Sequence, residues 1–315
     1  MPAVLPVLRE LPAVQDLLTP QELRILVAVA EAGGFSPAGA ALGITQSAVS
    51  HAVRATEAKL GAVLFDRGRS GARPTPAGER AVALARRILR LYELLAVEVR
   101  GSGPGSGSGS GPGAVTGTLR IAAFRSAALH LLPPALERLT ARHPGIRPEV
   151  RVVRELGAGT AGEVAAGRAD LGIATLGGST GVPSGLLSGV LAEEPYALVH
   201  PAGHPDPKAL PLLDWDENCG SYTREWWRAQ DWIPRAAVKA EDDGMVLTMV
   251  ERGLGMAIMP ALSLTGAPDT VRITDLGPER PTRSVGYVTT RELAGTPAVQ
   301  ALIRELRAGR RTSGG

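Results

Sequence analysis

The chain has 315 residues, an ordinary apolar share of 44% and a net charge of only +3, so it can form two or three domains with real cores. Cys219 is the only cysteine, which excludes a disulfide framework and a cysteine-based metal site. No run reaches about 18 apolar residues, and no basic and apolar leader opens the chain. We therefore expect a cytoplasmic protein without a membrane span.

Residues 1–18 precede the first helical pattern and include Pro2, Pro6 and Pro12. Such a segment is typical of a flexible extension. The alternative is that these residues lie upstream of the true start of translation.

Residues 34–61 predict two short helices joined by a tight turn. Ser36 is suited to cap the first helix, and Pro37 to occupy its first position. Gly43 permits the turn, and Thr45 is suited to cap the second helix, which Gly61 ends. Each helix has small or apolar residues for packing: Ala38, Ala41 and Leu42 in the first, and Ala48, Val49, Val53 and Leu60 in the second.

The start of the second helix carries polar side chains that suit a DNA major groove. Residues at the start of a recognition helix reach base edges, while later ones reach phosphates. Gln46 can pair with adenine, and Arg54 suits phosphate neutralisation. The DNA-binding candidates of this region are Ser36, Thr45, Gln46, Ser47, Ser50, His51, Arg54 and Lys59.

Two short strands are predicted at 64–65 and 73–75, around a turn with Arg67 and Arg69 near its tip; Arg73 follows on the second strand. Between residues 45 and 90, nine Lys or Arg residues stand against three acids, and 9 − 3 gives a local charge of +6. Concentrated charge indicates DNA binding better than net charge does. The alternative is a solvated basic helical hairpin, which explains single residues but not the ordered set.

The ordered set resembles the winged helix-turn-helix domain of the LysR-type transcriptional regulators, over residues 19–76. This resemblance implies double-stranded DNA as a partner. Three positions depart from the family pattern: Gly39 stands where Ala is usual, His51 where Arg is usual, and Thr56 where an apolar residue is usual. Because His51 differs, the operator contacts of the family do not transfer directly.

One long helix is predicted over residues 77–100, with two apolar stripes. Val82, Ala85, Leu89, Tyr92 and Ala96 form the first, and Leu84, Ile88, Leu91 and Leu95 the second. A helix with two such stripes usually needs a partner on each side. The resemblance implies a linker helix that pairs subunits in a homodimer or homotetramer, and the alternative is a helix packed wholly on its own domain.

Residues 101–116 are predicted to be a tether, because 101–113 contain only Gly, Ser and Pro. Thirteen such residues span roughly 20 Å as a random chain. This length argues against rigid coupling between the domains before and after the tether.

The rest of the chain alternates strands and helices, which favours a parallel sheet. Strands are predicted at 118–124, 146–153, 169–175, 191–200, 218–222, 236–239, 256–260 and 283–290, and helices at 127–142, 158–166, 225–230, 243–252 and 297–307. Segments such as Leu132-Pro133-Pro134 and residues 250–260 resemble the effector-binding domain of the same family. The resemblance implies a C-terminal two-lobe α/β fold of the type II periplasmic-binding-protein class, with lobe I at 117–190 and 283–308, lobe II at 191–282 and a flexible tail at 309–315.

The resemblance places a small-molecule effector in a cleft between the lobes. Helix N-termini and the carboxyl ends of strands suit an anionic ligand such as a carboxylate. The candidate effector-binding residues are Arg125, Ser126, Thr175, Tyr222, Thr223 and Arg224. Each has a structural alternative: Ser126 can cap a helix, and Arg125 or Arg224 can form a salt bridge or face solvent.

Two further groups of residues in this region have structural explanations. Trp226, Trp227 and Trp232 line a pocket or, as we favour, pack the core of lobe II. The acidic run 241–243 suits the N-terminus of a helix.

No sequence motif indicates catalysis, a cofactor or a metal. The chain lacks Gly-x-Ser-x-Gly, Gly-x-x-x-x-Gly-Lys and His-Glu-x-x-His, and His200 and His204 are flanked by prolines that exclude a helix between them. We therefore expect an effector-responsive transcriptional regulator rather than an enzyme. The alternatives are a small-molecule binding protein with a vestigial DNA-binding domain, and an α/β enzyme fused to a DNA-binding module.

Overall fold

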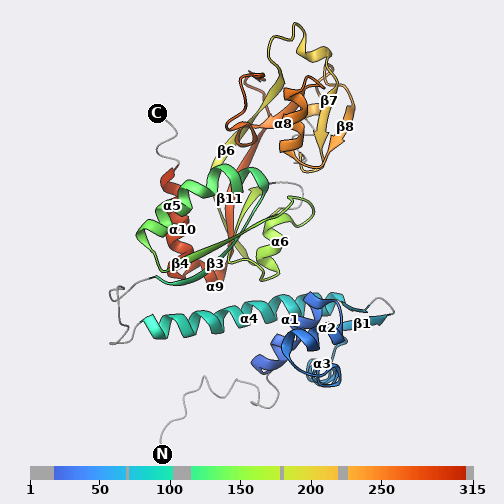
Figure 1. The fold of residues 1–315 in the computed structure, drawn as a ribbon, viewed down its shortest axis with the longest axis vertical. Helices are drawn as coiled ribbons and strands as arrows, with labels where there is room; N and C mark the ends of the chain where they lie inside the picture. Colours follow the sequence, from blue (N-terminus) through green and yellow to red (C-terminus); the bar gives the residue numbers. More distant parts are fainter. Residues whose placement is uncertain (1–17, 69–70, 102–114, 178–180, 219–225, 310–315) are drawn as a thin grey trace, which may run out of the picture. The chain divides into compact units, whose positions relative to one another are not determined.

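The computed structural model describes residues 18–68, 71–101, 115–177, 181–218 and 226–309. The chain forms two compact units, Met1–Arg100 and Gly101–Gly315 (Figure 1). Each unit is built around its own hydrophobic clusters.

The first unit contains three short helices, a two-stranded wing and a long helix. These are α1 (Pro20–Ala32), α2 (Phe35–Leu42), α3 (Gln46–Leu60), β1 (Phe65–Gly68), β2 (Gly71–Pro74) and α4 (Pro76–Gly101). Thr19 and Glu22 form a reciprocal capping box at the start of α1. Thr45 caps α3 as predicted, since its hydroxyl accepts the N–H of Ala48 at 3.2 Å.

Helix α2 begins at Phe35, two residues before the predicted first position at Pro37, so the prediction that Ser36 caps it is wrong. Gly34 occupies the cap position and, because glycine has no side chain, supplies no capping hydrogen bond. The earlier start places the Phe35 ring edge-on to the Phe65 ring at 6.3 Å, which joins the helix to the wing. Pro37 is still tolerated, because N–H groups of the first turn have no partner inside a helix.

The core of the first unit differs from the predicted face of α3. Ala48 and Leu60 are exposed, whereas Ser50 and Thr56 are buried beside Val49 and Val53. The Thr56 hydroxyl donates to the carbonyl of Ala52 at 2.9 Å, which satisfies the buried polar group. A polar residue at this position therefore fits the fold.

Gly39 fits the turn between α2 and α3 for a steric reason. A Cβ atom there would lie 2.8 Å from the carbonyl oxygen of Ile44. The glycine lets the two helices approach closely at their junction.

The wing strands are longer than predicted. Strands β1 and β2 pair antiparallel from Phe65 opposite Pro74 to Gly68 opposite Gly71. Helix α4 begins directly after β2, with the Thr75 hydroxyl accepting the N–H of Gly78. On α4, Val82 and Ala85 are buried against the unit, whereas the whole second stripe is exposed: Leu84, Ile88, Leu91 and Leu95.

The second unit is built on a mixed sheet rather than the wholly parallel sheet that the alternation predicted. Its strand order is β10-β6-β11-β5-β3-β4, and β9 also pairs with β6. The strands are β3 (Gly117–Ala123), β4 (Ile146–Val152), β5 (Leu171–Leu176), β6 (Leu186–Pro201), β9 (Ala257–Pro260), β10 (Val271–Asp275) and β11 (Thr282–Thr290). Strands β3, β4 and β5 are parallel, while β6 and β11 run antiparallel to their neighbours.

Two long strands join the two lobes of this unit. The first half of β6 pairs with β11, and its second half pairs with β9 and β10. Figure 1 shows β6 and β11 running between a lobe that carries α5, α6 and α10 and a lobe that carries α8. We call these lobe I and lobe II. A small parallel sheet in lobe II joins β7 (Leu212–Trp215) to β8 (Ala236–Ala240).

The predicted strand at 218–222 lies mostly outside the described residues, and the predicted helix at 225–230 is helical only at 226–228 within them. The other helices of the second unit follow the prediction, with one local change and one short addition after β11. They are α5 (Leu132–Arg142), α6 (Gly159–Ala165), α8 (Asp243–Glu251), α9 (Arg291–Ala294) and α10 (Pro297–Ala308), with 3₁₀ turns η4 (Pro207–Ala209) and η5 (Ala261–Leu264). The segment before α5, η3 (Ala127–Leu131), is a π-helical turn. Pro133 and Pro134 have no N–H to donate, so the preceding turn widens and Leu132 donates to the carbonyl of Ala127 instead.

Candidate DNA interface and effector site

Exposed polar side chains line the first three turns of α3. Gln46, Ser47, His51 and Arg54 are all exposed. The hydroxyls of Thr45 and Ser47 lie 3.0 Å apart, which holds the start of the helix in one arrangement. This exposed face carries amide, hydroxyl, imidazole and guanidinium groups, which are the groups that contact bases and phosphates in a DNA groove.

Two of the predicted DNA-binding side chains are engaged inside the unit. Ser50 is buried and accepts a hydrogen bond from Arg54 Nη2 at 3.0 Å, so it orients that guanidinium. Lys59 Nζ lies 2.8 Å from Glu22 Oε1 and joins the end of α3 to the start of α1. Burial alone would raise the pKa of Glu22, but the hydrogen bond from Lys59 and those from Thr19 outweigh it and lower this pKa below its ordinary value.

The wing contributes Arg73, which is exposed on β2 opposite Asp66. Arg69 and the side chain of Arg67 lie outside the described residues, and Ser36 is exposed on α2. Glu57, which the sequence did not single out, accepts the N–H groups of Leu64 and Phe65 at 2.8 and 3.3 Å. It thereby fixes the start of the wing to α3.

The predicted effector residues of lobe I gather at the carboxyl ends of its parallel strands. Arg125 and Ser126 follow β3, and Thr175 lies near the end of β5. Ser126 is buried, and its hydroxyl makes no capping hydrogen bond. Arg125 Nη1 lies 2.8 Å from Asp243 Oδ1 of lobe II, so Arg125 pairs with an acid, the first of the alternatives that its position allowed.

The backbone N–H of Thr175 is already occupied by a carboxylate of the protein. Glu155 Oε1 accepts it at 3.2 Å, and Glu155 Oε2 accepts the N–H and the hydroxyl of Thr160 at 3.1 and 2.8 Å. Burial raises the pKa of Glu155 above its ordinary value, against the hydrogen bonds of Thr160 and Thr175 and the charge of Arg283, which lower it. Glu155 therefore takes the place at the start of α6 that an anionic ligand would suit.

A buried ion pair joins the two long strands where the lobes meet. Arg283 on β11 donates from Nε to Glu194 on β6 at 2.6 Å, and the two residues are direct cross-strand neighbours. The guanidinium lies over the Phe124 ring, 4.9 Å from its centroid. Arg283 Nη2 is buried without a hydrogen-bond partner among the described residues. Glu194 also accepts the N–H of Leu262 in η5.

The acidic run 241–243 lies at the N-terminus of α8, as predicted, and it also makes contacts outside the helix. Asp242 caps the helix by accepting the N–H of Met245 at 2.9 Å. Asp243, which is buried, accepts the hydroxyl of Ser263 at 2.6 Å besides pairing with Arg125. Sequence reasoning missed Glu194 and Arg283, because each finds its partner on a distant strand. It also missed Glu155, whose carboxylate joins Thr160 of α6 to Thr175 of β5.

The remaining predicted residues of lobe II divide into two groups. Tyr222, Thr223 and Arg224 lie outside the described residues. The three tryptophans pack around a buried cluster in lobe II that includes Tyr196 and Leu198, as we favoured: Trp226, Trp227 and Trp232.

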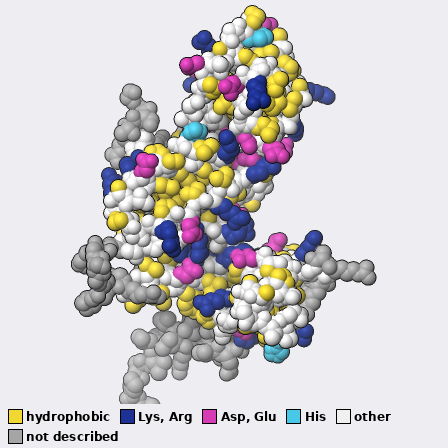
Figure 2. All heavy atoms as spheres, in the orientation of Figure 1, with side chains coloured by type: hydrophobic (Ala, Val, Ile, Leu, Met, Phe, Trp, Pro, Cys, Tyr) yellow, Lys and Arg dark blue, Asp and Glu magenta, His cyan; other side chains and the backbone are white. Residues whose placement is uncertain are grey.

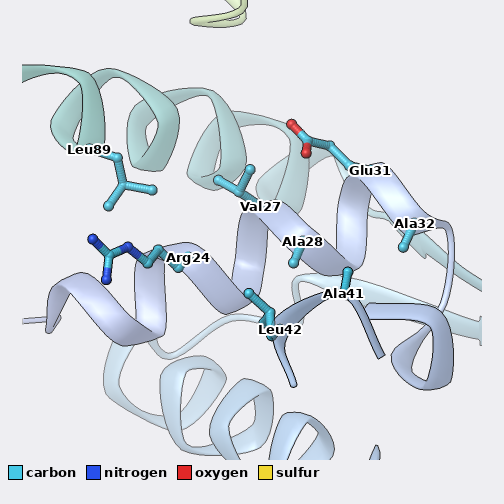
Figure 3. Close-up of a pocket in the computed structure, with 8 residues that line it drawn as sticks. All are labelled: Arg24, Val27, Ala28, Glu31, Ala32, Ala41, Leu42 and Leu89. Carbon is cyan, nitrogen blue, oxygen red and sulfur yellow. The ribbon is translucent and has the colours of Figure 1, made fainter. Parts of the chain in front are cut away.

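An open hollow of about 470 Å³ lies in the first unit beside α4 (Figure 3). Helices α1, α2 and α4 contribute its lining, which is mainly apolar: Arg24, Val27, Ala28, Glu31, Ala32, Ala41, Leu42 and Leu89. The hollow extends the apolar surface of α4 on the side of its first stripe.

Two further types of site are absent from the described residues, a membrane span and a metal centre. None of the helices in that part of the chain is long and apolar enough to cross a membrane. Over the same residues, no group of three or more His, Cys, Asp or Glu side chains could hold a metal ion.

Comparisons with known proteins identify both units. The model of the bacterial regulatory helix-turn-helix proteins of the lysR family matches residues 20–79, and that of the LysR substrate binding domain matches residues 112–311. A probable HTH-type transcriptional regulator, LrrA of Synechococcus elongatus, is 34% identical over 91% of this chain and 95% of its own length. The regulator IlvY of Escherichia coli is 25% identical over 89% of this chain and 96% of its own.

Solved structures agree on the fold. Full-length OxyR from Pseudomonas aeruginosa, in a variant form, superposes with a TM-score of 0.67 at 21% identity, covering 92% of this chain and 98% of that one. The regulator CbnR in complex with its target DNA gives a TM-score of 0.61 at 20% identity, covering 92% and 99%. With the matches to both domain models, these comparisons show that the chain belongs to the family of LysR-type transcriptional regulators.

Proposed function

We propose that this regulator reads a specific DNA site with the start of α3 and responds to a small-molecule effector bound between lobes I and II. The observation that carries the proposal is the exposed row on α3, which an N-cap and an internal hydrogen bond hold in place. Side chains with such a fixed arrangement suit the reading of base edges.

The DNA interface that we propose has a base-reading part and a phosphate-binding part. Gln46, Ser47 and His51 face the bases, and the flanking groups position the domain on the backbone: Ser36, Thr45, Ser50, Arg54, Lys59, Arg67, Arg69 and Arg73. For Ser50 and Lys59 the role is indirect or needs rearrangement, because Ser50 holds Arg54 and Lys59 pairs with Glu22.

For the effector we propose a site at the carboxyl ends of β3 and β5, facing lobe II. Arg125, Ser126 and Thr175 would contribute from lobe I, and Tyr222, Thr223 and Arg224 from lobe II. An anionic effector is supported by Arg125 and by the buried donor of Arg283. Full-length LysG from Corynebacterium glutamicum, which has a similar fold, was solved with a bound effector, Arg.

We further propose that the protein works without catalysis and as a homodimer or homotetramer paired through α4. Effector and DNA would then be coupled through the arrangement of the subunits. We keep the predicted boundaries for the winged domain (19–76), the linker helix (77–100), the tether (101–116) and the two lobes.

The decisive experiment is a fluorescence-anisotropy titration of the full-length protein with the DNA upstream of its own gene, beside a scrambled fragment of equal length. We expect tight binding to the native fragment only. Gln46→Ala should reduce the preference over scrambled DNA by about 1–3 kcal/mol, the worth of one good base contact. Gln300→Ala, at an exposed position on α10, is the matched control and should bind like the wild type.

Each other outcome has a definite meaning. Equal affinity of the wild type for both fragments would contradict a sequence reader of this site and favour the alternative, a small-molecule binding protein with a vestigial DNA-binding domain. An unchanged preference in Gln46→Ala would remove α3 from the proposed base contacts while leaving the regulator itself in place.

A further inference from the structure

Side chains from lobe I reach lobe II at two separate points. At the first, Arg125 Nη1 lies 2.8 Å from Asp243 Oδ1, and Arg125 Nε lies 3.7 Å from Asp242 Oδ1. At the second, Arg154 Nε lies 2.9 Å from Glu217 Oε1, and Arg154 Nη2 donates to the carbonyl of Glu241 at 3.1 Å. Figure 2 shows acidic and basic side chains next to one another where the two lobes meet.

The first contact is shaped for Arg125. A Cβ atom on Gly244 would lie 2.1 Å from Arg125 Nη2, so the guanidinium rests directly on the backbone of the first turn of α8. A cation is unfavourable at a helix N-terminus, where the helix dipole is positive. Asp242 and Asp243 offset that cost, and Ser263 holds the Asp243 carboxylate in place.

The second contact also involves the backbone of lobe I. The N–H of Glu155 donates to Glu217 Oε2 at 3.1 Å, so Glu217 accepts from both Arg154 and its neighbour. The Glu217 side chain is 13% exposed, whereas Arg154 is 54% exposed. The Glu217 carboxylate is therefore largely enclosed, and the more exposed Arg154 side chain reaches it from the surface of lobe I.

Behind these contacts, the ion pair of Arg283 and Glu194 ties the long strands to Phe124 of lobe I and to η5 of lobe II. Residue 124 precedes Arg125, and η5 also contains Ser263, the partner of Asp243. The interactions thus close a ring around the junction of the lobes.

We propose that Arg125 and Arg154, with Asp242, Asp243 and Glu217, form a latch that holds the two lobes together without an effector. The latch is a property of the fold and stands whether or not the proposed effector site is correct. Because Arg125 and Arg154 are 39% and 54% exposed, water and salt weaken their pairs, and the latch can open reversibly.

The test measures the distance between the lobes in the full-length protein. Cys219→Ser removes the native thiol, and Glu137→Cys on lobe I with Asp269→Cys on lobe II supplies two exposed sites for spin labels. Double electron–electron resonance then gives the distance distribution. We expect one narrow population in the latched protein and a second, longer population when Arg125→Ala and Arg154→Ala are combined.

Arg168→Ala is the matched control, because it removes an ion pair of 2.6 Å with Glu163 that lies wholly within lobe I. It should leave the distribution unchanged. A distribution in the double variant identical to that of the control would overturn the latch. If the double variant does not fold, the wild-type distribution at about 1 M salt decides, because screening then acts within about 3 Å. A longer population that grows with salt supports the latch, and an unchanged distribution overturns it.

Discussion

Glu155 illustrates how a single residue can couple the second unit to pH. Burial raises its pKa in the folded protein, although Thr160, Thr175 and Arg283 favour the charged form. The folded state therefore binds the proton of Glu155 more tightly than the unfolded state does. Its contribution to stability is complete below the ordinary glutamate pKa and is lost as the pH rises through the raised value.

Comparison with Glu155→Gln, which does not titrate, isolates this effect. We expect the free energy of unfolding of the wild type, minus that of the variant, to decrease as the pH rises from about 4 to about 7. Chemical unfolding at several pH values measures it, and Glu279→Gln, at an exposed position, controls for the loss of one carboxylate. A difference that grows with pH would show that the hydrogen bonds, not burial, dominate.

Residues whose partners are close in sequence were predictable, and those whose partners are distant were not. Thr45 and Asp242 cap helices within three residues, so local patterns suffice. Arg283 and Glu194 are 89 residues apart and meet only because β6 and β11 pair. Exposure of the first turns of α3 also followed from sequence, whereas the ion pair of Lys59 with α1 did not.

At the scale of elements, most helices and strands were predicted from the sequence, but several of them begin or end at other residues than predicted. The early start of helix α2 places Phe35 against Phe65, and a π turn precedes α5 because Pro133 and Pro134 have no N–H groups to donate. Strands β7 and β10 were not predicted, and β6 (Leu186–Pro201) is longer than the strand predicted at 191–200. The antiparallel pairing of β6 and β11 is set by the long-range path of the chain, which alternation alone does not encode.

The junction of the wing and α4 depends on Gly78. A Cβ atom there would lie 1.9 Å from the carbonyl oxygen of Leu64, which accepts the N–H of Thr75 at 2.9 Å. We expect Gly78→Ala to push this carbonyl away and to destabilise the first unit by about 1–3 kcal/mol, the usual cost of overpacking. Thermal unfolding of the full-length protein measures the change.

Gly295→Ala is the matched control for Gly78→Ala. Gly295 has φ −82°, and no neighbouring atom lies within 4 Å of its added Cβ. Alanine there should be neutral or stabilise by about 0.4–1 kcal/mol. Equal stability of Gly78→Ala and the wild type would mean that the start of α4 can move away from β1.

At the scale of the whole molecule, the exposed apolar stripe of α4 bears on how subunits associate. Leu84, Ile88, Leu91 and Leu95 are exposed on one stripe of the helix, and the hollow of Figure 3 adjoins the other stripe. Contiguous apolar surface of this kind usually marks an interaction site. It favours pairing through α4 over the alternative, a helix packed wholly on its own domain.

A charge placed on this stripe tests the pairing directly. Leu95 is 58% exposed, so Leu95→Glu should leave the fold of each subunit intact while placing an unpaired carboxylate in the interface. Together with the lost apolar contact, we expect association at least about tenfold weaker, or about 1.4 kcal/mol. Sedimentation velocity over a range of concentrations measures it. Leu254→Glu adds the same charge at a lobe II position that is 54% exposed, and it should sediment like the wild type. If both variants associate as the wild type does, the subunits pair through another surface, and coupling between effector and DNA would have to cross that surface instead of α4.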